Sequence, residues 1–320
     1  MTQNMTVGPL TAAPGEKVQG YYPIPGSGMK LPVTLINGEA DGKRVLITAG
    51  VHGGEYPGIQ AAIELGAELS PLGMSGAVIL VPVTNVMGFE AKDSAHFPED
   101  GKNLNRLFPG DPDGTIGDRV AWCLTSDFHS QADFYMDLHS GNADEALTPL
   151  AFVPQACAPE VAELSRRAAD FLDIPLAIRS TSLNGACGSA AARGVPGVLL
   201  ERGGNGLWSR EETDADKRDV QNILRWLKVL PGEPEASAAS PAWVTRAVYL
   251  NAGATGCFIP FVKAGEDVQK GQKLAEIRDY FGHVLASYSS GINGRIFYLT
   301  SSLAIQEGHS MIAMGEVPNE

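Results

Sequence analysis

The sequence predicts an α/β fold, with a mostly parallel mixed sheet and helices on both faces, followed by a small C-terminal all-β module. Between residues 31 and 230, short apolar runs alternate with stretches of helical periodicity, which is typical of a parallel sheet covered by helices. Residues 231–242, PGEPEASAASPA, have little to bury and predict a linker. Beyond them the helical pattern stops, and short β segments separated by glycine-containing turns follow. We therefore expect an α/β domain over residues 1–230 and a β barrel or sandwich over residues 243–320.

Strands and helices are expected to alternate along the first domain. Apolar runs predict strands at residues 33–36, 45–49, 77–83, 134–138 and 197–200. Apolar side chains at helical spacing predict helices at residues 59–69, 116–131, 159–172 and 210–230. The run at 77–83 is continuously apolar, as expected for a strand that is buried on both faces. Pro159 stands near the start of its helix, where the missing N–H donor does no harm.

The composition excludes several kinds of partner. The 320-residue chain has 24 Lys and Arg against 37 Asp and Glu, a net charge of −13, which argues against nucleic acid and against an anionic membrane surface. No apolar run approaches the roughly 20 residues of a membrane-spanning helix, and the N-terminus lacks the pattern of a secretory signal. The four cysteines have no paired spacing, which favours a reducing cytoplasm. We expect a cytoplasmic protein with a small-molecule substrate, and self-association into a homo-oligomer is left open.

The C-terminal module contains a pattern of its own. Residues 262–274, VKAGEDVQKGQKL, resemble the turn-and-strand unit of biotinyl and lipoyl carrier domains, and residues 303–312 are a weaker copy. A carrier domain needs a lysine on an exposed hairpin to hold its cofactor, but no lysine follows Lys273. We expect the carrier fold without the attachment lysine and without the carrier function.

The segment 47–58, ITAGVHGGEYPG, carries the most chemical information. It begins as an apolar strand and breaks into a glycine-rich loop before a helix, so His52 and Glu55 follow the carboxyl end of a strand, where open α/β sheets bind ligands. One alternative is a tight turn with a glutamate favoured by the helix dipole. Another is a phosphate-binding loop, although the spacing fits neither a dinucleotide fingerprint nor a P-loop.

A second strand end, in residues 134–141, FYMDLHSG, also carries a histidine. Together, His52, Glu55 and His139 are an adequate ligand set for a catalytic zinc ion, with one position left for water. The same nitrogen and carboxylate ligands also accept iron or manganese. Asp137 lies on the same side of the strand as His139 and is expected either to orient its ring or to be a buried structural residue.

Two further segments supply a candidate base and candidate substrate contacts. In VLLERGG, Glu201 directly follows buried apolar residues, so its carboxylate is expected at the strand end as a general base. The alternative is a surface glutamate paired with Arg202. In DGKNLNRLFPG, Asn105 and Arg106 are adjacent donors that suit a substrate carboxylate. The alternative there is a loop stabilised by Asn side chains next to a solvated Arg.

The ordered combination GVHGGE, NLNRLFPG, DLHSG and LLERGG resembles the succinylglutamate desuccinylase/aspartoacylase family, of the zinc-carboxypeptidase-like (M14) clan. The resemblance spans about residues 30–230, and the β module resembles a domain appended in that family. It implies a zinc-carboxypeptidase-like catalytic domain and hydrolysis of an N-acyl amino acid or a similar small amide, with one zinc ion per chain. The residue roles that it implies are metal ligation by His52, Glu55 and His139, catalysis by Glu201, and substrate binding by Asn105 and Arg106.

The chain departs from the family pattern in two places. Members often carry a further Arg before the NR motif that polarises the scissile carbonyl, but the basic residues between Thr84 and Asn105 are only Lys92, His96 and Lys102. Members that act on acidic amino acids also use an Arg shortly before the catalytic Glu strand, where this chain has Arg193. A neutral or amine-bearing side chain on the substrate is therefore at least as well supported as an acidic one.

Other functions were weighed against the deacylase. A zinc carboxypeptidase acting on short peptides would need a longer groove, which the C-terminal module is able to close. A non-catalytic small-molecule binding protein of the same fold is disfavoured because all four expected metal and base positions are filled. A serine hydrolase is disfavoured because the chain has no G-x-S-x-G elbow.

Overall fold

The computed structural model describes residues 3–92, 96–235 and 240–317. Within these residues the largest sheet has nine strands, parallel in its centre and mixed toward its edges. Its order is β12 (Ala242–Val244), β10 (Leu176–Ser180), β9 (Leu150–Pro154), β11 (Gly197–Glu201), β7 (Phe134–His139), β5 (Ala40–Ala49), β6 (Ser75–Val81), β4 (Lys30–Asn37) and β3 (Glu16–Pro23). This confirms the predicted mostly parallel mixed sheet.

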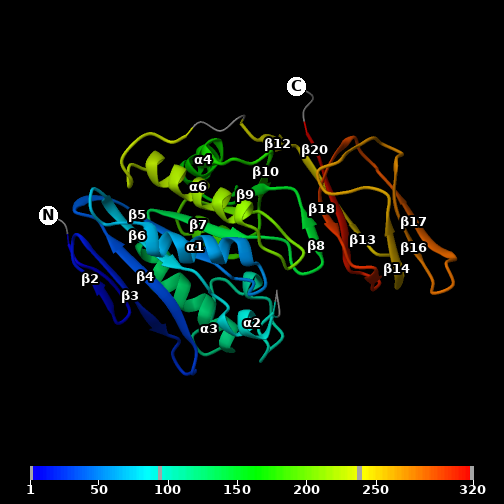
Figure 1. Ribbon diagram of the computed structural model, residues 1–320. Coiled ribbons are helices and arrows are strands. Elements are labelled where there is room, and N and C mark those ends of the chain that lie inside the picture. The colour runs from blue at the N-terminus through cyan, green and yellow to red at the C-terminus, as the bar shows by residue number, and fades with distance from the viewer. Residues whose placement is uncertain (1–2, 93–95, 236–239, 318–320) are drawn as a thin grey trace.

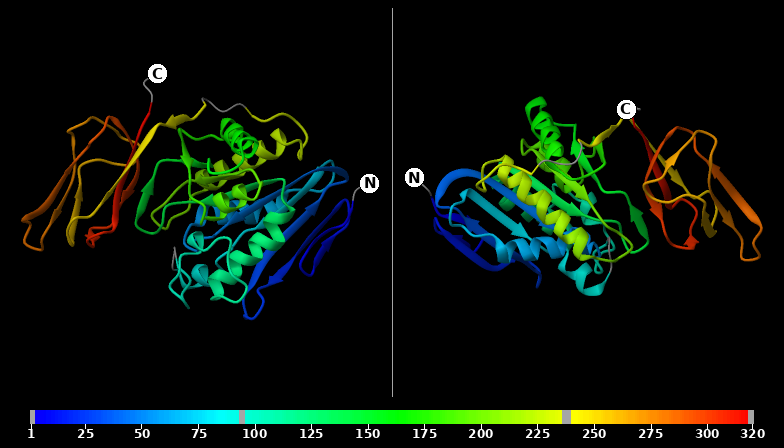
Figure 2. Two further views of the ribbon diagram at one scale, coloured as in Figure 1. Left: turned by 180° about the vertical axis from the view of Figure 1, so that it is seen from behind. Right: turned by 45° about the horizontal axis from the view of Figure 1, so that its top comes forward.

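Helices cover both faces of this sheet (Figure 1). One face packs against α1 (Tyr56–Glu68), α4 (Pro159–Ala168) and α6 (Arg210–Trp226), and the other against α3 (Ile116–Cys123) and α5 (Ala186–Ala192). Val45 and Ile47 of β5 point to the first face, and Leu46 points to the second. Because side chains alternate across a strand, a strand covered on both faces needs apolar residues throughout, which explains the continuous runs. The reverse view in Figure 2 shows α3 on the face opposite α1 and α6.

Some helical segments differ in detail from the sequence pattern. The segment 116–131 is helical, but α3 ends at Cys123 and is followed by a π-helical turn, Leu124–Phe128, and a 3-10 turn, His129–Gln131. The long helix α6 ends at Trp226, and Lys228 adopts a left-handed backbone with φ 60°, which terminates a helix. No helix in the described part of the chain is long and apolar enough to cross a membrane.

The C-terminal region is built from two antiparallel sheets. One contains β13 (Arg246–Asn251), β20 (Ser310–Glu316), β18 (Gly294–Thr300) and β15 (Asp267–Val268), and the other β17 (Val284–Ser289), β16 (Lys273–Arg278), β14 (Gly256–Pro260) and β19 (Ala304–Ile305). Phe258, Leu274, Ile296 and Ile312 contribute to an apolar core in this region. The loss of helical periodicity in the sequence correctly predicted an all-β structure.

Two short strands connect the region of the nine-stranded sheet with the C-terminal β region. Strand β8 (Glu145–Leu147), which follows β7 in the chain, pairs with β18, while β12 pairs with β10 in the large sheet. Phe297 of β18 and Leu150 of β9 belong to one buried apolar cluster. The division into domains at 231–242 stays a prediction: residues 236–239 lie outside the described part of the chain, and β12 begins at the last residue of the expected linker.

A buried ion cluster attaches the end of β11 to α6. Arg202 donates from Nε to Asp216 Oδ1 at 3.0 Å and from Nη2 to Asp219 Oδ2 and to the carbonyl oxygen of Asp173. Arg202, Asp216 and Asp219 are all buried. Arg202 therefore pairs with helix α6 and not with Glu201, and each buried charge depends on its partners because an unpaired one is costly.

We predict that Arg202→Ala lowers the free energy of unfolding by about 3–5 kcal/mol, because it leaves two aspartates buried without their cation. Urea denaturation measures this change. Arg166→Ala is the control, since Arg166 pairs with Glu163 on the exposed side of α4 and the loss should stay below about 1 kcal/mol. Equal losses in the two variants would contradict the structural role of the buried cluster.

Candidate active site

The loop after β5 brings His52 and Glu55 to the edge of the sheet. Gly50 has a φ of 62°, a left-handed conformation that turns the chain out of the strand. Gly53 lies against the helix α2 (Val86–Ala91), where an added Cβ would come within 2.1 Å of the backbone nitrogen of Phe89. Glu55 is the N-cap residue of α1. The glycines therefore let the loop pass close to a neighbouring backbone while it presents a histidine and a glutamate.

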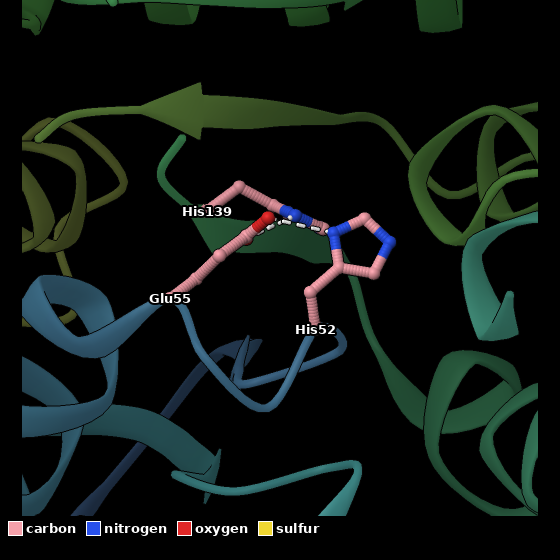
Figure 3. A group of neighbouring side chains, drawn as sticks. All are labelled: His52, Glu55 and His139. Atoms are coloured by element: carbon pink, nitrogen blue, oxygen red, sulfur yellow. Dashed lines mark hydrogen bonds and ion pairs between the residues drawn. The ribbon is translucent and has the colours of Figure 1, made fainter. Parts of the chain in front are cut away.

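His52, Glu55 and His139 converge on one point (Figure 3). Nδ1 of His52 lies 2.7 Å from Glu55 Oε1, and Nδ1 of His139 lies 2.8 Å from Glu55 Oε2. One ligand atom from each residue lies within 4.8 Å of the others. Two imidazoles and one carboxylate are the donor set of many catalytic zinc sites, in which ligand atoms stand roughly 3.4 Å apart. These residues form a group that could hold a metal ion, and their donor chemistry fits zinc.

The outer nitrogen of each histidine also has a partner. His139 Nε2 lies 3.1 Å from Asp137 Oδ2, and His52 Nε2 lies 3.0 Å from Asn103 Oδ1. Because both partners are acceptors, Nε2 of each ring donates to them, and Nδ1 is the ring nitrogen that would face a metal ion. The sequence suggested Asp137 for this role, whereas Asn103 was not singled out although it belongs to the NLNR motif.

The charges of the three residues are strongly coupled. Burial acts to raise the pKa of Glu55, but the charges of His52 and His139 outweigh it and lower the pKa to about 2. Burial acts to lower the pKa of His139, but the carboxylates of Asp137 and Glu55 raise it well above its usual value. A buried glutamate that is ionised and faces two imidazoles provides the negative potential that a divalent cation needs.

Glu201 stands next to this group because of strand pairing. In the parallel pair β7–β11, Glu201 is the register partner of His139. Its Oε2 is buried, and within the described residues it has no hydrogen-bond partner. Burial raises the pKa of Glu201 well above its usual value, and the charges of Glu55 and Glu145 add to this effect. A carboxyl group with a raised pKa beside a group able to bind a metal is suited to accept and return a proton.

Asn105 and Arg106 reach the same place from the 3-10 turn Leu104–Arg106. Asn105 Oδ1 accepts from the backbone N–H of Ala186 at 2.8 Å, so the amide nitrogen is the group that Asn105 can offer to a ligand. Arg106 Nη1 donates to the carbonyl oxygen of Asn105 at 2.8 Å, which fixes one side of the guanidinium. The two side chains therefore present hydrogen-bond donors toward one pocket.

A single pocket of about 400 Å³ unites these residues. Its lining includes His52, His139, Glu201, Asn105 and Arg106. Tyr249 of β13 also lines it, so the C-terminal region contributes to the wall. Tyr249 was not predicted, because nothing in a local pattern indicates which distant strand completes a pocket.

The other basic residues considered in the sequence lie elsewhere. Among the described residues that line the pocket, Lys92, His96, Lys102 and Arg193 do not appear. Lys102 donates to Asp118 at 2.6 Å, and Arg193 donates to Ser189 on its own helix. His96, the suggested substitute for the missing upstream Arg, therefore does not line the pocket. Arg193, which precedes the strand of Glu201, does not line it either.

The fold and the site define an α/β protein whose strand ends hold a His–Glu–His group with a further glutamate beside it. Residues 41–227 match the family described as succinylglutamate desuccinylase/aspartoacylase catalytic domain. The chain belongs to this family, as the resemblance in the sequence motifs predicted.

Similar proteins agree with this assignment. The chain is 31% identical over 258 residues, 78% of its own length and 74% of the relative's, to the N-alpha-acetyl-L-2,4-diaminobutyric acid deacetylase of Halomonas elongata. A crystal structure of a succinylglutamate desuccinylase/aspartoacylase from Rhodobacter sphaeroides has a TM-score of 0.85 at 27% identity and covers 95% of this chain and 96% of that one. The product-bound ectoine utilization protein EutE (DoeB) from Ruegeria pomeroyi has a TM-score of 0.86 at 25% identity, with coverages of 93% and 95%.

We predict that His52→Ala removes the bound metal, because two remaining ligands hold a divalent cation much more weakly than three. Elemental analysis of purified protein should fall from about one ion per chain to near zero. His309→Ala is a matched control, since His309 is an exposed histidine of the C-terminal region. Full metal content in the His52 variant would show that the ligand assignment is wrong.

Proposed function

We propose that the protein is a zinc-dependent hydrolase that cleaves the amide bond of an N-acyl amino acid. The observation that carries this proposal is the unpartnered, buried Oε2 of Glu201 in the same pocket as His52 and His139, two members of the group His52, Glu55 and His139. Family membership and the deacetylase relative support amide hydrolysis as the reaction. Cytoplasmic location and the oligomeric state stay predictions, and the four cysteines are free thiols.

The residues of the chain divide the work of hydrolysis. A zinc ion held by His52, Glu55 and His139 would lower the pKa of a water molecule and polarise the amide carbonyl. Glu201 accepts the proton of the attacking water and then delivers it to the amine nitrogen as the C–N bond breaks. The products are a carboxylic acid and an amine, so one water molecule is consumed for each amide.

Asn105 and Arg106 hold the carboxylate of the amino acid. An amide N–H and a guanidinium form charge-assisted hydrogen bonds with a carboxylate, and the planar guanidinium fixes its orientation. Because both side chains line the pocket that contains Glu201, this contact sets the distance between the amide carbon and the attacking water.

The charges of the pocket support a substrate with one carboxylate. Arg106 is the only Lys or Arg among the described residues that line it, and Glu201 adds a carboxyl group. A second carboxylate, as in an aspartyl or a succinyl group, would therefore be desolvated without its own cation. A neutral or cationic side chain avoids this cost, and the diaminobutyrate derivative named for the Halomonas relative is such a substrate.

A carboxypeptidase acting on short peptides is less well supported. The pocket of about 400 Å³ is the size of a small-molecule site, and Tyr249 of the C-terminal region contributes to its lining. A non-catalytic binding protein would have no need of a glutamate oxygen left without a partner, because such a group destabilises the fold.

We predict that kcat/KM is at least about tenfold higher for Nα-acetyl-L-2,4-diaminobutyrate than for N-acetyl-L-aspartate or N-succinyl-L-glutamate, because only the last two carry more than one carboxylate. The released primary amine is measured at equal protein and zinc concentrations. Nα-acetyl-L-norvaline is the matched neutral compound and should also exceed both acidic substrates. A preference for either acidic substrate would contradict the proposed specificity, and no released amine from any of the four would contradict the deacylase itself.

We also predict that Glu201→Gln lowers kcat by about 10² or more, because an amide of the same size cannot accept the water proton. Zinc content and KM should change little. Glu276→Gln, at a buried glutamate of the C-terminal region, should leave kcat within about twofold. Near-normal turnover in a zinc-loaded Glu201 variant would show that another group transfers the proton.

A further inference from the structure

A hydrogen-bonded network of three buried side chains, Thr48, Tyr135 and Asp137, lies next to His139 and outside the lining of the pocket. Thr48 Oγ1 donates to Asp137 Oδ1 at 2.6 Å and lies 2.6 Å from the hydroxyl oxygen of Tyr135. Asp137 Oδ2 lies 3.1 Å from Nε2 of His139. The relative exposures of Thr48, Tyr135 and Asp137 are all 0%, so water does not compete for these groups.

The donor and the acceptor of each hydrogen bond in this network can be assigned. An ionised carboxylate only accepts, so the hydroxyl proton of Thr48 points to Asp137, and Thr48 Oγ1 in turn accepts the proton of Tyr135. Burial raises the pKa of Tyr135 well above its usual value, which keeps that proton in place. On its other oxygen, Asp137 accepts the Nε2 proton of His139, so Nδ1 is the ring nitrogen that faces Glu55, at 2.8 Å from Oε2.

The sheet holds the side chains of this network in position. Thr48 of β5 and Asp137 of β7 are register partners in a parallel pair, and Tyr135 lies two residues before Asp137 on the same face. The ring of His129 packs against that of Tyr135, with 4.7 Å between the centroids. This packing holds the ring of Tyr135, and with it the position of its hydroxyl oxygen.

We propose that Thr48 and Tyr135 are positioning residues that fix the Asp137 carboxylate and, through it, the ring orientation and tautomer of His139. The proposal rests on the proposed function only in taking His139 as a metal ligand. Without the Thr48 hydroxyl, Asp137 Oδ1 would lose its donor in a region of low dielectric, and the carboxylate would no longer be held toward Nε2. The expected result is a weaker metal site in a protein that still folds.

The test measures zinc affinity directly, by competition between the purified protein and a chromophoric chelator. Thr48→Val should weaken zinc binding by about tenfold, the lower end of the range for residues that hold a metal ligand in place. Thr48→Ser keeps the hydroxyl and should stay within about threefold of the unaltered protein. Thr84→Val is the matched control, because Thr84 is equally buried but its hydroxyl donates to the carbonyl oxygen of Ala49 at 2.9 Å.

Tyr135→Phe removes a single oxygen atom and provides a second variant if Thr48→Val does not fold. It should weaken zinc binding by about threefold, since Thr48 can still donate to Asp137.

The outcomes separate this proposal from the proposed function. Thr48→Val and Tyr135→Phe could bind zinc as tightly as the unaltered protein and lower only the thermal midpoint, as expected for Thr84→Val. In that case the network has a structural role alone and the proposal is overturned. An unaltered protein that binds no zinc would refute the zinc site itself, and the proposal with it.

Discussion

The parallel pairing of β5, β7 and β11 is the constraint on which the rest of the site depends. It pairs Thr48 with Asp137, and His139 with Glu201, so three strands end together at one edge of the sheet. Residues two apart on a strand share a face, which turns Asp137, His139 and Glu201 to the same side. A shift of one residue in either pairing would send part of this set to the opposite face, against α1 and α6. The same strand pairing therefore determines both the stability of the sheet and the geometry of the site.

Two adjacent residues at the end of β11 show how the protein treats buried polar groups. Arg202 donates to Asp216, Asp219 and a backbone carbonyl oxygen, whereas Glu201 keeps one buried oxygen without a partner in the described residues. Asp216 Oδ2 is also buried without a partner in these residues, so what distinguishes Glu201 is that its carboxyl group lies in the pocket. The unsatisfied carboxyl group lies on the pocket side, and the satisfied guanidinium lies on the α6 side. The carboxyl group of Glu201 is therefore available to a ligand in the pocket, while Arg202 attaches the end of the same strand to α6.

Much of this arrangement could be predicted from local sequence, because apolar runs and glycine-rich breaks mark where a strand ends. His52, His139 and Glu201 were identified in this way, each as the polar residue that follows such a run. Asn103, Thr48 and Tyr249 were not, because their roles depend on pairings across distant parts of the chain that no local window records. Strands β8 and β12 were missed for the same reason: each has three residues, too few to show a period, and each is defined by its partner. His96 shows the converse: the family pattern suggested it as a substitute for the missing upstream Arg, but it is not among the described residues that line the pocket.

The C-terminal region enters the chemistry through the wall of the pocket. Strand β8 lies in the segment that directly follows His139, and its pairing with β18 ties that segment to the sheet whose edge strand β13 carries Tyr249. The strand that presents a candidate metal ligand therefore also fixes the outer wall. Tyr249 and Arg106 line the same pocket, and its volume of about 400 Å³ suits one acylated amino acid better than an extended peptide. The strand ends and the C-terminal region therefore both contribute to the pocket in which the proposed hydrolysis would take place.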